Sequence, residues 1–100
     1  MIQTVKAANR KELEEITQYK DLSISKIIIN RITETIDNDE ELVHIMDLLI
    51  EDEEVVLEVK LEKTEFKQAL ERNLAIHEKH EDYASCTKIK DLLNKYYNEH

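Results

Sequence analysis

The chain of 100 residues contains neither glycine nor proline. Average usage would place about seven glycines and five prolines in a chain of this length. Glycine is the usual residue for positive φ, and proline supplies a fixed φ for tight turns. Without them, loops must be few and must be built from Asn, Asp and Ser. The sequence therefore predicts an all-α or mainly α protein, organised as a small helical bundle.

The length predicts one domain, residues 1–100, with a helical part at 1–63 and a helical hairpin at 64–100. The aromatic content is one Phe and four Tyr, so little that self-association is expected to complete the core. The single cysteine excludes an internal disulfide and fits the reducing cytoplasm of a bacterium or of a phage-infected cell. No apolar run is long enough for a signal peptide or for a helix that crosses a membrane.

The clearest pattern is an amphipathic helix that is predicted to begin at Thr64. Its hydroxyl can cap one of the first unpaired backbone amides of the helix. Asn73 and His77 lie in the middle of the apolar face. The rest of this face, at helical spacing, consists of Phe66, Ala69, Leu70, Leu74 and Ile76.

A second helix is predicted to begin near Asp82, where a short acceptor side chain can cap. Its apolar residues are Tyr83, Cys86, Ile89, Leu92, Leu93, Tyr96 and Tyr97. Only His80 and Glu81 separate the two patterns. A connection this short places consecutive helices side by side and antiparallel. We therefore expect a helical hairpin in the last third of the chain.

The run from Glu81 to Leu93 also carries a family pattern. An acidic pair, an aromatic residue, two small residues, an aliphatic residue, a basic residue, Asp and a second aliphatic residue occur here as Glu81 with Asp82, Tyr83, Cys86 with Thr87, Ile89, Lys90, Asp91 and Leu93. This run resembles the second half of the UVR motif, the helical hairpin of the excision nuclease B and C subunits and of some Clp and arginine-kinase adaptor proteins. In that family the hairpin docks other proteins, so the resemblance implies protein binding without catalysis.

The net charge of −9 is concentrated in the middle of the chain. Residues 32–59 contain eleven acidic residues and no Lys or Arg, whereas residues 1–31 carry a net charge of +2 and residues 60–100 are neutral. Such a block must be solvated or must face a basic partner. A solvated helix face is one interpretation, and a surface that binds a basic protein is the other. The basic residues near the C-terminus are too sparse for direct nucleic-acid binding.

Two further helices are predicted before the acidic block. Asn9 and Glu12 have the spacing of a capping box, and Leu13, Ile16 and Tyr19 form one face of a helix that ends near Lys20. Asp21 or Ser23 can cap the next helix. Its face consists of Ile24, Ile27, Ile28, Ile32 and Ile36. A strand competes here because Ile and Thr are dense, but the four-residue spacing favours a helix.

The centre of the chain is predicted as a helix followed by a strand. The helix would run from Asp39 to about Ile50, with an apolar face of Leu42, Val43, Ile45, Met46, Leu49 and Ile50. Alternation of Val55, Leu57, Val59 and Leu61 then favours one short strand near 55–61. Its partner would be residues 2–5 or the same strand of a second subunit. The alternative is one continuous helix from Asp39 into the hairpin.

One cluster has the residue types of a metal site. His77, His80 and Cys86 could provide three zinc ligands across the mouth of the hairpin, with Glu81 or Asp82 as a fourth. Against this, histidine is favoured at a helix C-terminus by the dipole alone, and a buried cysteine is usually a small apolar side chain. The same cysteine lacks an orienting residue and an oxyanion donor for nucleophilic catalysis. We therefore expect no metal, no cofactor and no catalytic site.

The leading functional hypothesis is a small intracellular interaction module. It would bind a protein partner through the hairpin residues Tyr83, Ile89, Leu93, Tyr96 and Tyr97. A second hypothesis is an acidic decoy of the kind that small phage inhibitors use. Residues 34–54 would bind a basic surface that normally holds nucleic acid, with Glu51, Asp52, Glu53 and Glu54 as contact residues. A third is a self-assembling structural protein, closed by the strand near 55–61 or by the isoleucine face.

Overall fold

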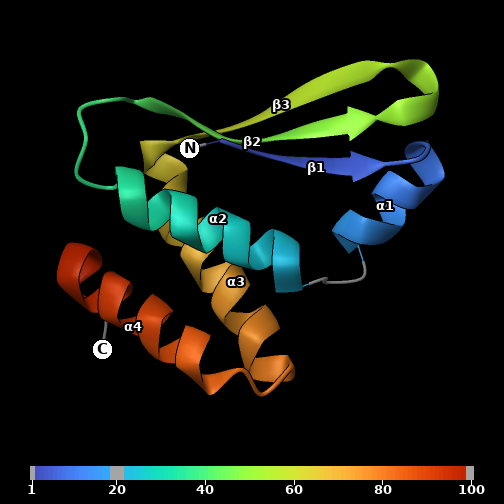
Figure 1. Cartoon of the computed structure of the whole chain (residues 1–100). Coiled ribbons are helices and arrows are strands. Elements are labelled where there is room, and N and C mark those ends of the chain that lie inside the picture. The colour runs from blue at the N-terminus through green and yellow to red at the C-terminus, as the bar shows by residue number, and fades with distance from the viewer. Residues whose placement is uncertain (1, 19–21, 99–100) are drawn as a thin grey trace.

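The computed structural model describes residues 2–18 and 22–98. Along the chain lie β1 (Gln3–Ala7), α1 (Arg10–Gln18), α2 (Leu22–Thr35), β2 (Leu42–Ile50), η1 (Glu51–Glu53), β3 (Val55–Glu62), η2 (Lys63–Glu65), α3 (Phe66–Lys79) and α4 (Tyr83–Tyr97). The three strands form one sheet, α2 and α3 lie below it, and α4 is the helix farthest from it (Figure 1). The prediction of an all-α bundle is therefore wrong, because the protein is mixed α/β.

The sheet has the order β1-β2-β3. β1 runs parallel to β2, and α1 and α2 provide the crossover that a parallel pair requires. β2 and β3 are antiparallel and are joined by the short turn of η1 and Glu54. The partner of β3 is thus β2, which the sequence had predicted as a helix, and the alternative of one continuous helix is wrong. The strand expected near 55–61 is present as β3.

β2 contains the irregularity that made it look helical in the sequence. His44 pairs with Lys60 and Met46 with Val59, so Ile45 is an extra residue in a β-bulge. The bulge shifts the alternation by one residue. As a result the buried side chains of β2 are Val43, Ile45, Met46, Leu48 and Ile50. Two alternating runs with such a shift imitate the three- and four-residue spacing of a helix, which explains the wrong prediction for Asp39 to Ile50.

The chain turns without glycine by placing larger residues in the left-handed region. Glu54, Glu81 and Asn98 have φ values of 52°, 57° and 54°. Such values are uncommon outside glycine and carry a conformational cost. Glu54 closes the β2–β3 turn, Glu81 lies between α3 and α4, and Asn98 ends α4. The absence of glycine therefore does not prevent a tight β-turn, and the argument from composition to an all-helical fold fails at Glu54.

Three of the predicted helix starts can be compared with the structure. Asn9 accepts a hydrogen bond from the Glu12 amide at 2.8 Å, while the Glu12 carboxylate accepts from the Ala8 amide at 3.2 Å. Asp82 caps α4 by accepting from the Ser85 amide at 3.4 Å. Thr64 is not a cap, because it lies within η2, the short turn that leads into α3. The predictions for residues 19–21 lie outside the described part of the chain.

One core joins the sheet to the helices. Its buried residues are Ile29, Ile32, Val43, Ile45, Met46, Leu48, Phe66, Leu70, Ile89 and Leu93. α3 and α4 contact each other and also share this core with α2 and the sheet. They form a V (Figure 1). The prediction of a bundle that ends in an antiparallel helical hairpin is therefore wrong, because α3 and α4 diverge (Figure 1) and belong to the core of an α/β fold.

Candidate functional site

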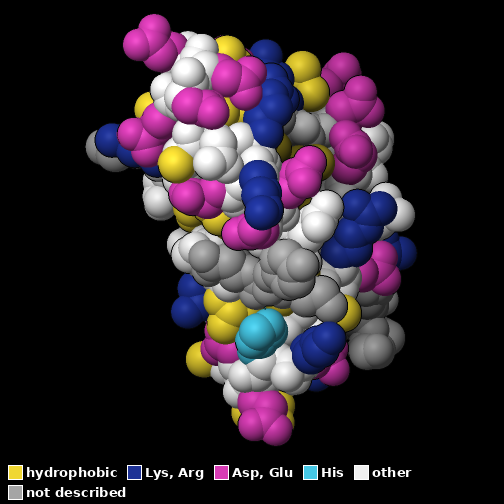
Figure 2. Space-filling view, turned by 90° about the vertical axis from the view of Figure 1, so that its right-hand side faces the viewer, with side chains coloured by type: hydrophobic (Ala, Val, Ile, Leu, Met, Phe, Trp, Pro, Cys, Tyr) yellow, Lys and Arg dark blue, Asp and Glu magenta, His cyan; other side chains and the backbone are white. Residues whose placement is uncertain are grey.

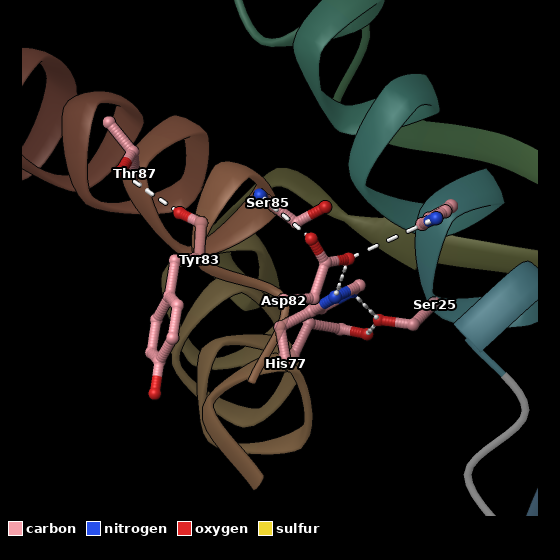
Figure 3. Close-up of polar contacts among 8 residues, drawn as sticks. Ser25, His77, Asp82, Tyr83, Ser85 and Thr87 are labelled. Carbon is pink, nitrogen blue, oxygen red and sulfur yellow. Dashed lines mark hydrogen bonds and ion pairs between the residues drawn. The ribbon is translucent and has the colours of Figure 1, made fainter. Parts of the chain in front are cut away.

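A buried polar cluster lies where α2, α3 and the start of α4 meet (Figure 3). Ser25 of α2 is 3% exposed, and His77 of α3 is fully buried. Ser25 Oγ lies 2.8 Å from His77 Nε2, and His77 Nδ1 lies 3.0 Å from Asp82 Oδ2. The Ser25 hydroxyl also forms a hydrogen bond with Asn73 Oδ1. The cluster connects three helices through side chains that are distant in sequence.

The helix geometry of α3 explains how the cluster forms. Asn73 and His77 are four residues apart, so they lie on one face of α3, the face that meets α2. The Asn73 amide nitrogen donates to the Ala69 carbonyl at 2.7 Å, which leaves its oxygen directed at Ser25. Asp82 is held by its role as the cap of α4. Lys26 lies 3.9 Å from the same carboxylate.

The acceptor at Asn73 sets the direction of the hydrogen bond of Ser25. Asn73 Oδ1 can only accept, so the single hydrogen of the Ser25 hydroxyl is directed to it. His77 Nε2 must then donate to Ser25 Oγ. His77 Nδ1 faces the Asp82 carboxylate, which also accepts. Both ring nitrogens of His77 therefore have a partner, and the ring joins Ser25 of α2 to Asp82 at the start of α4.

The order serine, histidine, aspartate invites comparison with a hydrolase triad, but the chemistry differs. In a triad the histidine accepts the hydroxyl proton of serine and so activates it as a nucleophile. Here the Ser25 hydrogen goes to Asn73, so His77 Nε2 donates to Ser25 Oγ instead of accepting its proton. Ser25 is also buried within a helix. The arrangement supports a joint between helices better than it supports an activated nucleophile.

An open groove of about 260 Å³ lies beside the cluster, between α1, α2, α3 and the inner face of the sheet. Its lining is mostly aliphatic and includes Ile16, Ile24, Ile28, Val59, Leu61 and Ile76. Ser25, Asn73 and Arg72 are among its polar lining residues. The groove therefore continues the apolar core and lacks the convergent polar groups of a site for a polar substrate.

The zinc ligands considered in the sequence do not form a site. Among the described residues, no group of three or more His, Cys, Asp or Glu side chains is arranged to hold a metal ion. Both nitrogens of His77 are occupied by Ser25 and Asp82. His80 is exposed, whereas Cys86 is buried. The three residues that the sequence grouped are thus in three different environments.

Two pKa shifts belong to this region. The pKa of Asp82 is held below its ordinary value of 3.8, chiefly by hydrogen bonding from Ser85, with smaller contributions from His77 and Lys26. Burial raises the pKa of the Cys86 thiol, and Glu78 raises it further. A thiol with a raised pKa is a poor nucleophile at neutral pH. Asp82 therefore remains charged, while Cys86 remains an uncharged residue of the core.

The partner-binding residues predicted on α4 divide between surface and interior. Tyr83 is 66% exposed at the start of the helix. Tyr96 donates a hydrogen bond to Asp37 Oδ2 at 2.8 Å, and Tyr97 is half-buried, with its pKa raised by burial. Ile89 and Leu93 belong to the core. Tyr83 is therefore the member of this group that offers most of its side chain to a partner.

The acidic block forms two separate groups instead of one helix face. Asp37, Asp39, Glu40 and Glu41 lie in the loop between α2 and β2. Glu51, Asp52, Glu53 and Glu54 form the β2–β3 turn. The nine residues of β2 lie between the groups and span about 30 Å. The interpretation as a solvated helix face is wrong, because the acidic residues are distributed over the end of α2, a loop, two strands and the β2–β3 turn.

The β2–β3 turn is the more concentrated group. Its four consecutive acidic residues are all exposed. Arg10 pairs with Glu53 at 2.7 Å, and no ion pair of Glu51, Asp52 or Glu54 occurs within residues 2–18 and 22–98. The end view of the molecule shows acidic side chains gathered over its upper part, where the turn and α1 lie (Figure 2). The turn thus presents mostly uncompensated negative charge.

Comparison with models of known protein families, with curated proteins and with solved structures gives no match. The resemblance of residues 81–93 to the UVR motif therefore stays a prediction. In the described part of the chain, no helix has both the length and the apolar character needed to cross a membrane.

Sequence reasoning did not find the buried cluster. The available signal was the pair Asn73 and His77, two polar residues four positions apart in the middle of an apolar face. Buried polar side chains need partners, so this pair indicated a third polar group opposite. Ser25 could not be identified from sequence, because it lies 48 residues from Asn73 and several serines and threonines are present in α2.

Proposed function

We propose that the protein is a small interaction module that acts by docking and uses the β2–β3 turn to bind a protein partner with a basic surface. The proposal rests on one observation, the four exposed carboxylates at residues 51–54. The turn continues into β3, where Val56 is 56% and Leu57 37% exposed. Charge beside apolar side chains is a combination suited to a protein surface, since charge orients the encounter and apolar contact adds affinity.

Electrostatics favours a basic partner over other classes. A chain of net charge −9 repels nucleic acid and anionic lipid, and its positive residues are dispersed. Three of the four carboxylates of the turn have no ion-pair partner among the described residues, so binding a cation there breaks no existing pair. Association should therefore be fast at low salt and should weaken as salt screens the interaction beyond about 8 Å.

Two other observations support docking over catalysis. The Ser25 hydroxyl donates to Asn73, so the serine, histidine and aspartate side chains lack the hydrogen-bond order of a nucleophile and its base. The UVR resemblance also implies protein binding, and it includes the exposed Tyr83 as a second contact residue. We place the module in a reducing cytoplasm because its one cysteine is free and buried.

The test reverses the charge of one acidic group at a time. Glu51→Lys, Asp52→Lys and Glu54→Lys together leave the Glu53 pair with Arg10 in place. The matched control is Asp39→Lys, Glu40→Lys and Glu41→Lys, which changes the net charge equally at the opposite end of β2. Both variants and the native protein serve as bait in cell extract, and bound proteins are quantified at increasing salt.

Loss of a salt-sensitive partner by the turn variant, with retention by the control, is the expected result. Equal binding by all three baits would contradict the proposal. If DNA displaces the partner from the native protein, the partner surface is one that also holds nucleic acid, as the decoy hypothesis requires. If DNA does not displace it, the partner is an ordinary basic protein surface.

A further inference from the structure

The outer edge of β3 is unpaired in the described part of the chain. β3 hydrogen-bonds to β2 on one side, and Figure 1 shows no described element beyond it on the other. Its eight residues contain no proline and no bulge on the free side. A free edge presents a row of unpaired N–H and C=O groups that can pair with another strand. Exposure of Val56 and Leu57 adds apolar side chains to this edge.

We propose that β3 pairs with β3 of a second copy of this chain, antiparallel and with Val59 on the two-fold axis. The order Glu58, Val59, Lys60 makes the edge complementary to itself. In this register Glu58 of each copy lies directly opposite Lys60 of the other, so the axis generates two ion pairs. Residues 56–62 of one copy pair with residues 62–56 of the other, which forms a continuous sheet of six strands.

Charge selects this register over its neighbours. Opposed residues of an antiparallel pair must point to the same face, so the register can change only by two residues. Each such change moves the two-fold axis by one residue. A step in one direction places Glu58 opposite Glu58, and a step in the other places Lys60 opposite Lys60. Like charges directly opposite destabilise a strand pair. An axis at Leu61 would pair Lys60 with Glu62 but would leave only residues 60–62 in the ladder.

The two faces of β3 both suit this pairing. Val55, Val59 and Leu61 are half-buried on the side of the helices, so the helical layer leaves part of this side open. Pairing about Val59 would place Leu57 against Leu61 of the second copy and would extend the apolar face. On the outer side Lys60 already reaches Glu58 of its own strand at 3.4 Å, and both side chains are about half exposed. Either can therefore turn to a partner strand.

The experiment measures mass in solution by sedimentation equilibrium at about 0.15 M salt, where net repulsion beyond about 8 Å is screened. The native chain should be a dimer at micromolar concentration. Glu58→Lys and Lys60→Glu each replace two attractive contacts with two repulsive ones, and each should raise the dimer dissociation constant about tenfold or more. Matched controls are Glu14→Lys and Lys11→Glu on the exposed surface of α1, which should leave the dimer unchanged.

The mixture of the two edge variants gives the sharpest result. A chain with lysine at 58 and 60 is complementary to a chain with glutamate at both, so equal amounts of Glu58→Lys and Lys60→Glu should form a heterodimer. The double variant Glu58→Lys with Lys60→Glu should again form a homodimer. Circular dichroism should show that all variants are folded, because both side chains are exposed. None of these measurements requires a partner protein.

A native chain that remains a monomer at micromolar to millimolar concentration would overturn the proposal. The charges on β3 would then protect the edge from pairing, a common use of edge charges. A dimer that is insensitive to both edge variants, or a mixture that fails to associate, would overturn pairing about Val59.

Discussion

The polar cluster around His77 and the β2–β3 turn both bring polar side chains together, but only the cluster pairs nearly all of them. In the cluster, Ser25, His77 and Asp82 match donors to acceptors, and no buried polar side-chain atom among the described residues lacks a partner. At the turn, Glu53 alone of four carboxylates has an ion-pair partner in that part of the chain. Buried polar groups that are all hydrogen-bonded hold the helices together, whereas exposed charge without a partner is available for binding.

The largest effect should come from replacing the residue at the centre of the cluster. His77→Ala leaves Ser25 and Asp82 without their shared partner and opens a cavity in a fully buried position. We expect a loss of about 3 kcal/mol or more in the free energy of unfolding, measured by urea denaturation. The control is His80→Ala, an exposed histidine three residues away, which should change stability by less than about 0.5 kcal/mol. Equal losses of stability in His77→Ala and His80→Ala would show that His77 does not join the helices.

Ser25→Ala should have the next largest effect. The substitution removes one hydroxyl and leaves both Asn73 Oδ1 and His77 Nε2 without a partner in a buried site. A loss of about 1–3 kcal/mol is expected from the groups left unpaired. Ser25→Ala combined with His77→Ala should cost less than the sum of the single changes, because the two residues share one interaction. Additive effects would show that the two side chains act independently.

The sequence predicted α2, α3, α4 and the strand β3, but not the three-stranded sheet against which the helices pack. Each helix has a regular apolar face and needs no unusual backbone within it. β2 was not predicted as a strand because its bulge at Ile45 imitates helical spacing, and because a turn without glycine depends on the left-handed Glu54. Tertiary packing holds both features in place against the local preference of the backbone. They cannot be read from propensity, which describes local preference alone.

The site was predictable to a smaller extent. The run of carboxylates at 51–54 is plain in the sequence, but its position at one end of the sheet depends on β2 and β3 as strands. Asn73 and His77 were visible as polar residues on an apolar face, whereas their partner Ser25 depends on the packing of α2 against α3. Ile89 and Leu93 show the converse, since the spacing that made them candidates for binding is the spacing of core residues.

Lowering the pH should weaken the cluster, because protonation removes the charge of Asp82. The folded pKa of Asp82 lies below its ordinary value of 3.8. Its contribution to stability is therefore fully present above that value and is lost as pH falls through the lower, folded pKa. Urea denaturation at stepwise lower pH should show this loss in the native chain and a smaller one in Asp82→Asn. Ser85→Ala provides a second test, since Ser85 is the chief cause of the shift. Identical dependence of stability on pH in all three chains would contradict a lowered pKa of Asp82 in the folded protein.

The smallest expected effect on stability concerns the ion pair that links the turn to α1. Arg10 and Glu53 are joined by two contacts, 2.7 Å and 3.1 Å long, but both side chains are exposed, and Arg10 lies at the positive end of the α1 dipole. A double-mutant cycle with Arg10→Ala and Glu53→Ala should therefore give a coupling of only about 0.2–1 kcal/mol. Arg10→Ala also frees the fourth carboxylate of the turn, so it should strengthen binding of a basic partner while it slightly lowers stability. Weaker binding by Arg10→Ala would show that the ion pair positions the turn for its partner, and that this exposed region is organised by matched charge as the buried cluster is.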